Sequence, residues 1–138
     1  MRPPLRDLPD KLRVMLVDDD ADERRLLARF LRGCGCVVFA QADGAAAALR
    51  LLREAPTPAD LIVTDCHMSD GDGLSLTRAL RRAGDPTPVI MFSGHTGPEA
   101  RAAAREAGVT RFVAKPFEAE RFLDAIYHVL GRRVARVA

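Results

Sequence analysis

The sequence lacks a strong excess of either charge, and it lacks a long apolar segment. Its 138 residues include 21 lysines and arginines against 19 aspartates and glutamates, a net charge of +2. That balance is unlike a surface built for the phosphate backbone of nucleic acid. No apolar run approaches the roughly 20 residues that a membrane helix needs, and the N-terminus has no apolar signal segment. We therefore expect this chain to bind neither nucleic acid nor membrane.

Cysteine is scarce, and the three cysteines are poorly placed for a disulfide framework or a zinc site. Cys34 and Cys36 are too close in sequence for a framework disulfide, and Cys66 stands alone. An odd number of cysteines without a signal segment fits a reducing compartment. We therefore predict a cytoplasmic protein, in which Cys66 serves as a small apolar side chain.

The apolar content is sufficient for one folded domain. Residues of the AVILMFWYC set make up 48% of the chain and charged residues 29%, as in ordinary globular proteins. A chain of this length forms one domain and buries roughly two-thirds of the surface that its unfolded form exposes. We assign residues 1–12 to an N-terminal extension, 13–131 to the folded domain and 132–138 to a short basic C-terminal tail.

Short apolar runs alternate with helical patterns along the chain. The runs, each typical of a strand buried on both faces, are 14–17, 37–40, 61–64, 89–92 and 112–114. Apolar residues at helical spacing follow each run, over about 22–31, 45–54, 74–83, 98–107 and 122–130. This alternation predicts an α/β fold, a five-stranded parallel sheet that is doubly wound with helices on both faces.

Polar side chains follow four of the predicted strands, at the point where each strand ends. In chain order they are Asp18 and Asp19, Asp65, Ser93 and Lys115. Ligands of parallel α/β sheets bind beyond the carboxyl ends of the strands, near the point where the strand order reverses. We therefore expect these side chains to meet in one site.

Carboxylates that converge in this way need a cation. Two unit charges about 4 Å apart interact by roughly 4 kcal/mol at an effective dielectric constant near 20. Mg²⁺ prefers carboxylate, carbonyl and water oxygens, and it accepts a phosphate oxygen. Asp65 can then act as a nucleophile toward phosphorus and form an acyl phosphate, while Mg²⁺ and Lys115 stabilise the transferred charge. The Ser93 hydroxyl can donate to a phosphoryl oxygen and so report its presence.

Over residues 13–131 the chain resembles the receiver domains of two-component response regulators, the CheY-like superfamily with a flavodoxin-like fold. The matching motifs are Asp18-Asp19 after VMLV, Asp65 within DLIVTDCHMSDGDG, Ser93 after VIMF, and Lys115 in FVAKPF. The resemblance implies that Asp65 accepts a phosphoryl group from a sensor histidine kinase or a phosphotransfer protein. Such a domain is a signalling switch that catalyses only its own phosphorylation and autodephosphorylation.

The resemblance also implies roles around the phosphoacceptor. Asp18, Asp19 and Asp65 would bind Mg²⁺ together with the backbone carbonyl of His67. His67 and His95 are candidates for side chains that set the lifetime of the acyl phosphate.

The resemblance further implies a movement that carries the signal. Ser93 and Phe112 would move on activation, and the Lys115–Pro116 peptide bond would be cis. The surface of the last two helices and the strand between them would then meet a downstream protein, with homodimerisation on phosphorylation as a further expectation.

The sequence departs from the family pattern at two positions. Ser69 stands where the family most often has proline, which predicts a looser loop. Phe112 stands where tyrosine is frequent, so that the tyrosine hydroxyl is missing but the ring can still move. Neither change removes a group needed for the chemistry.

Several polar residues have simpler interpretations than a role in the site. Asp20 and Asp22 favour the start of a helix, and Asp70 and Asp72 are typical turn residues. The arginines of the tail, Arg132, Arg133 and Arg136, complement the carboxyl end of the last helix or are solvated.

Two other functions compete with a phosphorylated switch. One is a phosphatase with an aspartyl-phosphate intermediate, but Asp22 stands where such enzymes need threonine or valine, and the chain is short for a cap over the substrate. The other is a receiver-like module that binds its partner without phosphorylation. The joint presence of Asp19, Asp65, Ser93 and Lys115 argues against that second alternative.

Overall fold

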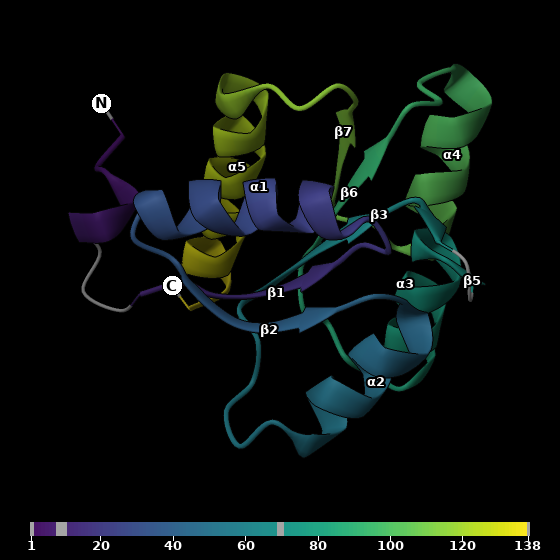
Figure 1. The fold of residues 1–138 in the computed structure, drawn as a ribbon, viewed down its shortest axis with the longest axis horizontal. Coiled ribbons are helices and arrows are strands. Elements are labelled where there is room, and N and C mark those ends of the chain that lie inside the picture. The colour runs from purple at the N-terminus through teal and green to yellow at the C-terminus, as the bar shows by residue number, and fades with distance from the viewer. Residues whose placement is uncertain (1, 8–10, 69–70, 138) are drawn as a thin grey trace.

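The structure, a computed structural model that describes residues 2–7, 11–68 and 71–137, has one central sheet covered by helices (Figure 1). The strands of this sheet are β1 (Arg13–Val17), β2 (Val37–Ala42), β3 (Leu61–Asp65), β6 (Val89–Ser93) and β7 (Arg111–Ala114). The α-helices are α1 (Ala21–Gly33), α2 (Ala45–Glu54), α3 (Gly73–Arg82), α4 (Pro98–Ala107) and α5 (Ala119–Val137). A short 3₁₀ helix, η1 (Leu5–Asp7), precedes them. The predicted α/β class is confirmed.

The order of the strands shows where the predicted site lies on the sheet. The sheet runs β2-β1-β3-β6-β7, and all of its pairs are parallel. The chain therefore moves outward from β1 to β2 and then crosses back to β3, so that the order reverses between β1 and β3. Val17 pairs with Thr64 across these two strands. Asp18 and Asp65 are thus the next residues on neighbouring strands, at the reversal point where such sheets bind ligands.

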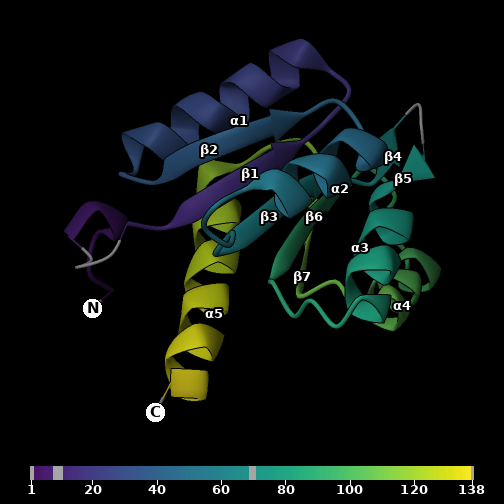
Figure 2. The same ribbon diagram turned by 90° about the horizontal axis from the view of Figure 1, so that it is seen from below.

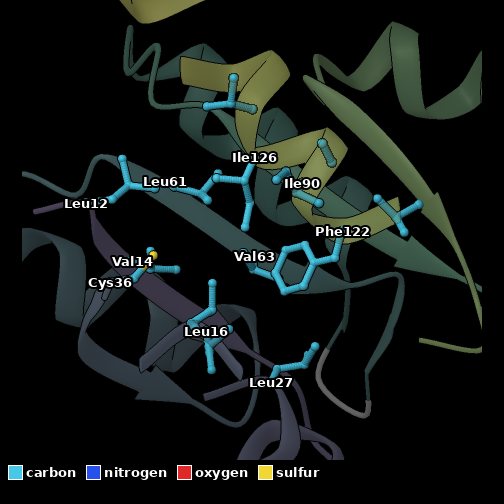
Figure 3. Close-up of a cluster of buried hydrophobic side chains, with 14 of the residues drawn as sticks. Leu12, Val14, Leu16, Leu27, Cys36, Leu61, Val63, Ile90, Phe122 and Ile126 are labelled. Atoms are coloured by element: carbon cyan, nitrogen blue, oxygen red, sulfur yellow. The ribbon is translucent and has the colours of Figure 1, made fainter. Parts of the chain in front are cut away.

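Alternate residues of the strands point to opposite faces of the sheet, and helices cover both faces (Figure 2). Val14 and Leu16 of β1 pack with Leu27 of α1 and with Phe122 and Ile126 of α5 in one buried cluster (Figure 3). On the other face, Met15 and Val17 pack with residues of α2 and α3, including Ala48, Leu76 and Leu80. Burial on both faces explains the continuous apolar runs of β1, β3 and β6. The edge strands β2 and β7 are only partly buried, and Val37 is exposed, so the prediction of burial on both faces was wrong for these two strands.

Capping side chains set the starts of two helices next to the functional edge. Asp20 precedes α1 and accepts hydrogen bonds from the backbone N–H groups of Asp22 and Glu23. Asp72 precedes α3 and accepts from the backbone N–H of Ser75 at 2.7 Å. The helix-capping interpretation of Asp20 is confirmed, and Asp72 likewise has a structural role.

Two short strands that the sequence did not predict follow β3. They form a short antiparallel pair, β4 (His67–Met68) and β5 (Gly71–Asp72), in which His67 lies opposite Asp72. Two-residue strands have no measurable hydrophobic period, which is why the sequence indicated only a loop. Ser69 and Asp70, the departure from the family pattern and one of the predicted turn residues, lie outside the described residues.

At both ends of the chain, the folded structure extends beyond the predicted limits of the domain. Leu5 and Leu12 belong to the segment assigned to an N-terminal extension, yet both are buried in the core beneath α1 and α5. Arg2 is paired with Asp124 of α5, with 2.6 Å between Nη1 and Oδ1. At the other end the helical backbone of α5 extends through the predicted tail. The domain limits themselves stay a prediction.

In the part of the chain that the structure describes, no helix is both long enough and apolar enough to span a membrane. Cys34, Cys36 and Cys66 all carry free thiols, and burial raises the pKa of the Cys36 thiol to about 11. Cys66 packs in a small cluster with Met91 and Ala104, which agrees with its predicted use as a small apolar side chain.

Candidate functional site

Three carboxylates meet at the edge between β1 and β3. One carboxylate oxygen from each of Asp18, Asp19 and Asp65 lies within 4.8 Å of the other two. Asp18 and Asp65 are almost fully buried, with exposed fractions of 2% and 8%, whereas Asp19 is exposed. A buried pair with one open side is what an oxygen-ligated cation that keeps water ligands requires. The donor set therefore fits Mg²⁺.

Asp18 lies beside the carboxylates of Glu23 and Asp65. The pKa of Asp18 is raised to about 7, first by burial and then by the nearby carboxylates of Glu23 and Asp65, while the hydrogen bond from the Asp20 N–H lowers it. The Asp20 N–H donates to Asp18 Oδ1 at 2.9 Å, and Arg24 donates to the Asp18 backbone carbonyl at 2.6 Å. Neither contact neutralises the carboxylate, so a bound cation would stabilise it.

Lys115 reaches the same cluster from the end of β7. Its Nζ lies 2.8 Å from Asp65 Oδ1 and 3.2 Å from Glu23 Oε1. Burial lowers the pKa of Lys115, but the bonds and charges of Asp65 and Glu23 outweigh burial, and the pKa is raised. The lysine is therefore a fixed cation beside the predicted phosphoacceptor. The Lys115–Pro116 peptide bond is cis, as the resemblance implied.

Glu23 was not identified from the sequence as part of this site. It lies in the first turn of α1, which begins just after the acidic pair, and its side chain is about as buried as that of Lys115. The signal available in the sequence was an acid in the first turn of the helix that follows the acidic pair. Acids in first turns are common for electrostatic reasons alone, so this signal is weak.

Ser93 ends β6 and is buried, with 1% of its surface exposed. Its Oγ accepts a hydrogen bond from the His95 N–H at 3.1 Å and donates to the His95 carbonyl at 3.2 Å. The hydroxyl is thus tied to its own loop. Asp65 Oδ1 also accepts from the Cys66 N–H at 2.9 Å, which fixes the orientation of the carboxylate of this predicted phosphoacceptor.

The two predicted lifetime modulators lie against each other. The rings of His67 and His95 are 5.3 Å apart between centroids and meet edge to face, and both residues are exposed. His67 comes from the loop after β3, the strand that ends in Asp65, and His95 comes from the loop after β6, which is next to β3 in the sheet. The sequence placed both residues beside the site but could not show that they touch.

Phe112, the predicted mobile aromatic, is half-buried in β7 and packs on the cluster of Cys66, Met91 and Ala104. The guanidinium carbon of Arg101 lies 4.9 Å from the centroid of its ring. Phe112 therefore contacts an apolar cluster, which includes the residue after Asp65, and a cationic side chain on α4.

Gly73 is a second residue whose role the sequence did not show. Its N–H donates to the Cys66 carbonyl at 2.8 Å, and a Cβ at this position would lie 2.5 Å from the Asp65 carbonyl oxygen. Only glycine permits so close an approach of α3 to the end of β3. The sequence signal was a glycine in a GDG turn, which is typical of many loops.

Comparison with known proteins agrees with this geometry. The sequence model of the response regulator receiver domain matches residues 14–127. The chain is 37% identical over 123 residues to the transcriptional regulatory protein PrrA of Mycobacterium leprae. These residues cover 89% of this chain and 52% of PrrA. The chain is 34% identical over 121 residues to the response regulator MprA of the same organism, covering 88% of this chain and 52% of MprA.

Solved structures give the same result. The chemotaxis protein CheY4 of Vibrio cholerae superimposes with a TM-score of 0.79 at 27% identity, over 87% of this chain and 99% of CheY4. A LuxR-family response regulator from Aurantimonas superimposes with a TM-score of 0.79 at 32% identity, over 88% and 86% of the two chains.

The chain belongs to the response regulator receiver domain family, the phosphorylatable signalling domains of two-component systems. It spans about half the length of the PrrA and MprA proteins that it matches.

Proposed function

We propose that Asp65 is the phosphoacceptor of this receiver domain. The observation that carries the proposal is the 2.8 Å contact between Asp65 Oδ1 and Lys115 Nζ beside an acidic cluster. A carboxylate oxygen of Asp65 attacks phosphorus, forming an O–P bond while the P–N bond of a donor phosphohistidine breaks and its imidazole leaves with the electron pair. The ion pair with Lys115 balances the negative charge that arrives with the phosphoryl group.

Asp18, Asp19, Asp65 and the backbone carbonyl of His67 are the proposed ligands of Mg²⁺. Bound there, Mg²⁺ would neutralise charge on the phosphoryl oxygens. Burial of Asp18 beside Asp65 supports this assignment because a bound cation would stabilise the ionised form of two neighbouring carboxylates.

Ser93, Lys115 and Phe112 are the proposed residues that respond to the phosphoryl group. The Ser93 hydroxyl exchanges its bond to the His95 carbonyl for a phosphoryl oxygen, and the phosphoryl group competes with Glu23 for Lys115. Movement of Ser93 frees space for Phe112. A hundredfold preference of the phosphoryl group for the moved state corresponds to about 2.7 kcal/mol. Hydrolysis of the acyl phosphate within the domain ends the signal, at a rate that His67 and His95 modulate.

The proposal includes partners. A sensor histidine kinase or a phosphotransfer protein donates the phosphoryl group, and α4, β7 and α5 present the surface for a downstream protein. Homodimerisation on phosphorylation and a cytoplasmic location complete the proposal. It also keeps the domain limits given above and assigns no nucleic-acid binding to this chain.

The test is phosphorylation by a small donor. Incubation with acetyl phosphate and Mg²⁺ is expected to add one phosphoryl group to the intact mass, and fragment masses should place it on Asp65. Omission of Mg²⁺, with a chelator added, should prevent the gain. Absence of any adduct at early times would support the module that works without phosphorylation. Rapid turnover of many phosphomonoesters would support the phosphatase.

Mg²⁺ is expected to stabilise the folded domain even without a phosphoryl group. At ten times its dissociation constant, a ligand that binds only the folded state adds about 1.4 kcal/mol to the free energy of unfolding. Urea unfolding with and without Mg²⁺ measures this gain. Asp19→Asn should lose most of it. Asp22→Asn, an exposed acid of the same helix start outside the cluster, should keep it; equal gains in both variants would contradict the proposed ligand set.

A further inference from the structure

The side chain of Glu23 faces the proposed phosphorylation site, although the residue belongs to the start of a helix. Asp20 caps α1 and accepts a hydrogen bond from the Glu23 N–H at 3.2 Å. The side chain of Asp22, in the same turn, is 89% exposed, whereas that of Glu23 is 29% exposed. An acid that served only the positive end of the helix dipole would be solvated, as Asp22 is. The burial of Glu23 therefore indicates a role beyond that of a first-turn acid.

Glu23 lies beside two groups of the site. Its carboxylate oxygens are 3.2 and 3.4 Å from Lys115 Nζ, the atom that also lies 2.8 Å from Asp65 Oδ1. Burial raises the pKa of Asp18 most, and among the neighbouring carboxylates Glu23 raises it more than Asp65 does. Lys115 is thus shared between Glu23 and the proposed phosphoacceptor, and Glu23 adds negative charge next to a proposed ligand of Mg²⁺.

Glu23 is outside the group of carboxylates that can share one ion. Among the described residues, the group of acid oxygens that lie within 4.8 Å of one another comes from Asp18, Asp19 and Asp65. Glu23 therefore acts on a bound Mg²⁺ through its charge and not as a ligand.

The formal charges of the site show what Glu23 adds. Lys115 and a bound Mg²⁺ together carry three positive charges. These are enough to balance the three proposed carboxylate ligands, Asp18, Asp19 and Asp65. Glu23 is a fourth carboxylate, so the site has one negative charge in excess before an anionic phosphoryl donor arrives.

This excess charge has opposite effects on the two ions that the site receives. A carboxylate attracts the divalent cation and repels the phosphoryl group, which carries about two negative charges. Glu23 also holds Lys115, the cation that the phosphoryl group needs. A residue that only supported the fold would change both kinds of binding in the same direction.

We propose that Glu23 is a positioning residue that holds Lys115 in the resting domain, and that its charge strengthens the binding of Mg²⁺ while it opposes transfer of the phosphoryl group. This inference rests on the proposed function, in which Asp65 accepts that group. Glu23 thereby sets two separate quantities, the Mg²⁺ concentration that the reaction requires and the rate of phosphorylation once Mg²⁺ is saturating.

The test measures the initial rate of phosphorylation by acetyl phosphate against Mg²⁺ concentration, by intact mass on the full chain. In Glu23→Gln, which keeps the size of the side chain, the Mg²⁺ concentration at half the maximal rate should rise roughly threefold to tenfold. The rate at saturating Mg²⁺ should rise by roughly the same factor, because the donor meets one negative charge fewer and Lys115 is released. Damage to the fold would instead lower the saturating rate.

Two further variants separate the charge from the contact and from the helix start. Glu23→Asp keeps the charge but shortens the side chain by one methylene group, so that Lys115 should be released while the Mg²⁺ requirement stays close to that of the wild type. Asp22→Asn removes an exposed charge of the same turn and should change neither quantity. Urea unfolding of each variant checks that the rates refer to folded protein.

Lys115 can be observed directly, because the chain has only two lysines, Lys11 and Lys115. In protein made with ¹³C-labelled lysine, each of them gives its own side-chain NMR signals. The Lys115 signals should shift in Glu23→Gln and in Glu23→Asp, without any phosphoryl donor, and stay in place in Asp22→Asn. The Lys11 signals should be the same in all of these proteins.

The role of Glu23 is refuted if the Lys115 signals do not move in Glu23→Gln, if the saturating rate is unchanged or falls, or if Asp22→Asn has the same effects. Where the wild type is phosphorylated on Asp65, these results leave the proposed function intact. A wild-type chain that gains no phosphoryl group refutes the proposed function. The Lys115 signals, and the Mg²⁺ affinity measured by NMR titration, then still decide whether Glu23 holds the lysine and attracts the ion.

Discussion

Asp65→Asn is expected to abolish phosphorylation by acetyl phosphate. Asparagine keeps the shape of the side chain and an oxygen that can accept the Cys66 N–H bond, but the amide is not a nucleophile toward phosphorus. Even in the presence of Mg²⁺, the intact mass should therefore show no phosphoryl gain over times that fully modify the wild type.

This loss should not come from unfolding. The substitution removes the charge that pairs with Lys115, but it also relieves repulsion between Asp65 and the buried Asp18. Because these effects oppose each other, we expect the free energy of unfolding to change by only about 1 kcal/mol. Urea unfolding of the same sample checks this point.

Asp72→Asn is the matched control. Asp72 is an aspartate of the adjoining loop that caps α3, and asparagine is as good a capping residue as aspartate. This variant should be phosphorylated like the wild type. A phosphoryl adduct of unchanged amount in Asp65→Asn, or its loss in both variants, would refute the assignment of Asp65.

Gly73→Ala is expected to damage both stability and phosphorylation. The new Cβ would lie 2.5 Å from the Asp65 carbonyl oxygen and 3.2 Å from the Met91 sulfur and the Thr64 methyl group, so that either α3 or the end of β3 must move. Overpacking of a buried position costs about 1 to 3 kcal/mol. Movement of β3 would also displace Asp65 from Lys115. We therefore expect a lower free energy of unfolding and a phosphorylation rate reduced by roughly tenfold or more.

Urea unfolding and the initial rate of phosphorylation, measured where the variant is fully folded, separate these effects. Gly33→Ala is a suitable control because a Cβ there meets no atom within 4 Å, and Gly33 is the last residue of α1. Alanine is a better helix former than glycine, so this control should be unchanged or slightly more stable. A folded Gly73→Ala protein with normal stability and rate would show that the contact does not matter.

Most of the fold could be predicted from the sequence, because its elements carry local signals. The run from Val14 to Val17 is apolar at every position, as burial on both faces of a parallel sheet requires, and the Asp18-Asp19 pair marks its end. The alternation of such runs with helical periods leaves few topologies open. The short β4 and β5 strands escaped prediction because two residues cannot show a period.

The carboxylates and the lysine of the site were also identifiable, because each one follows a strand. Asp18, Asp65 and Lys115 are polar residues that interrupt apolar patterns, and parallel strands bring their carboxyl ends to one edge. Membership of the receiver family was therefore readable from the motifs and is confirmed by the comparisons. The catalytic assignment of each residue still depends on the experiments above.

The sequence by itself thus determined the α/β class and the group of polar residues at the strand ends, because both follow from the order of residues along strands. Only the tertiary structure decided which distant residues support them. Glu23 meets Lys115 across 92 positions, Gly73 must be small because α3 begins against β3, and Arg101 covers Phe112 because α4 packs beside β7. These contacts depend on how helices rotate and pack against the sheet, and no local period encodes that rotation.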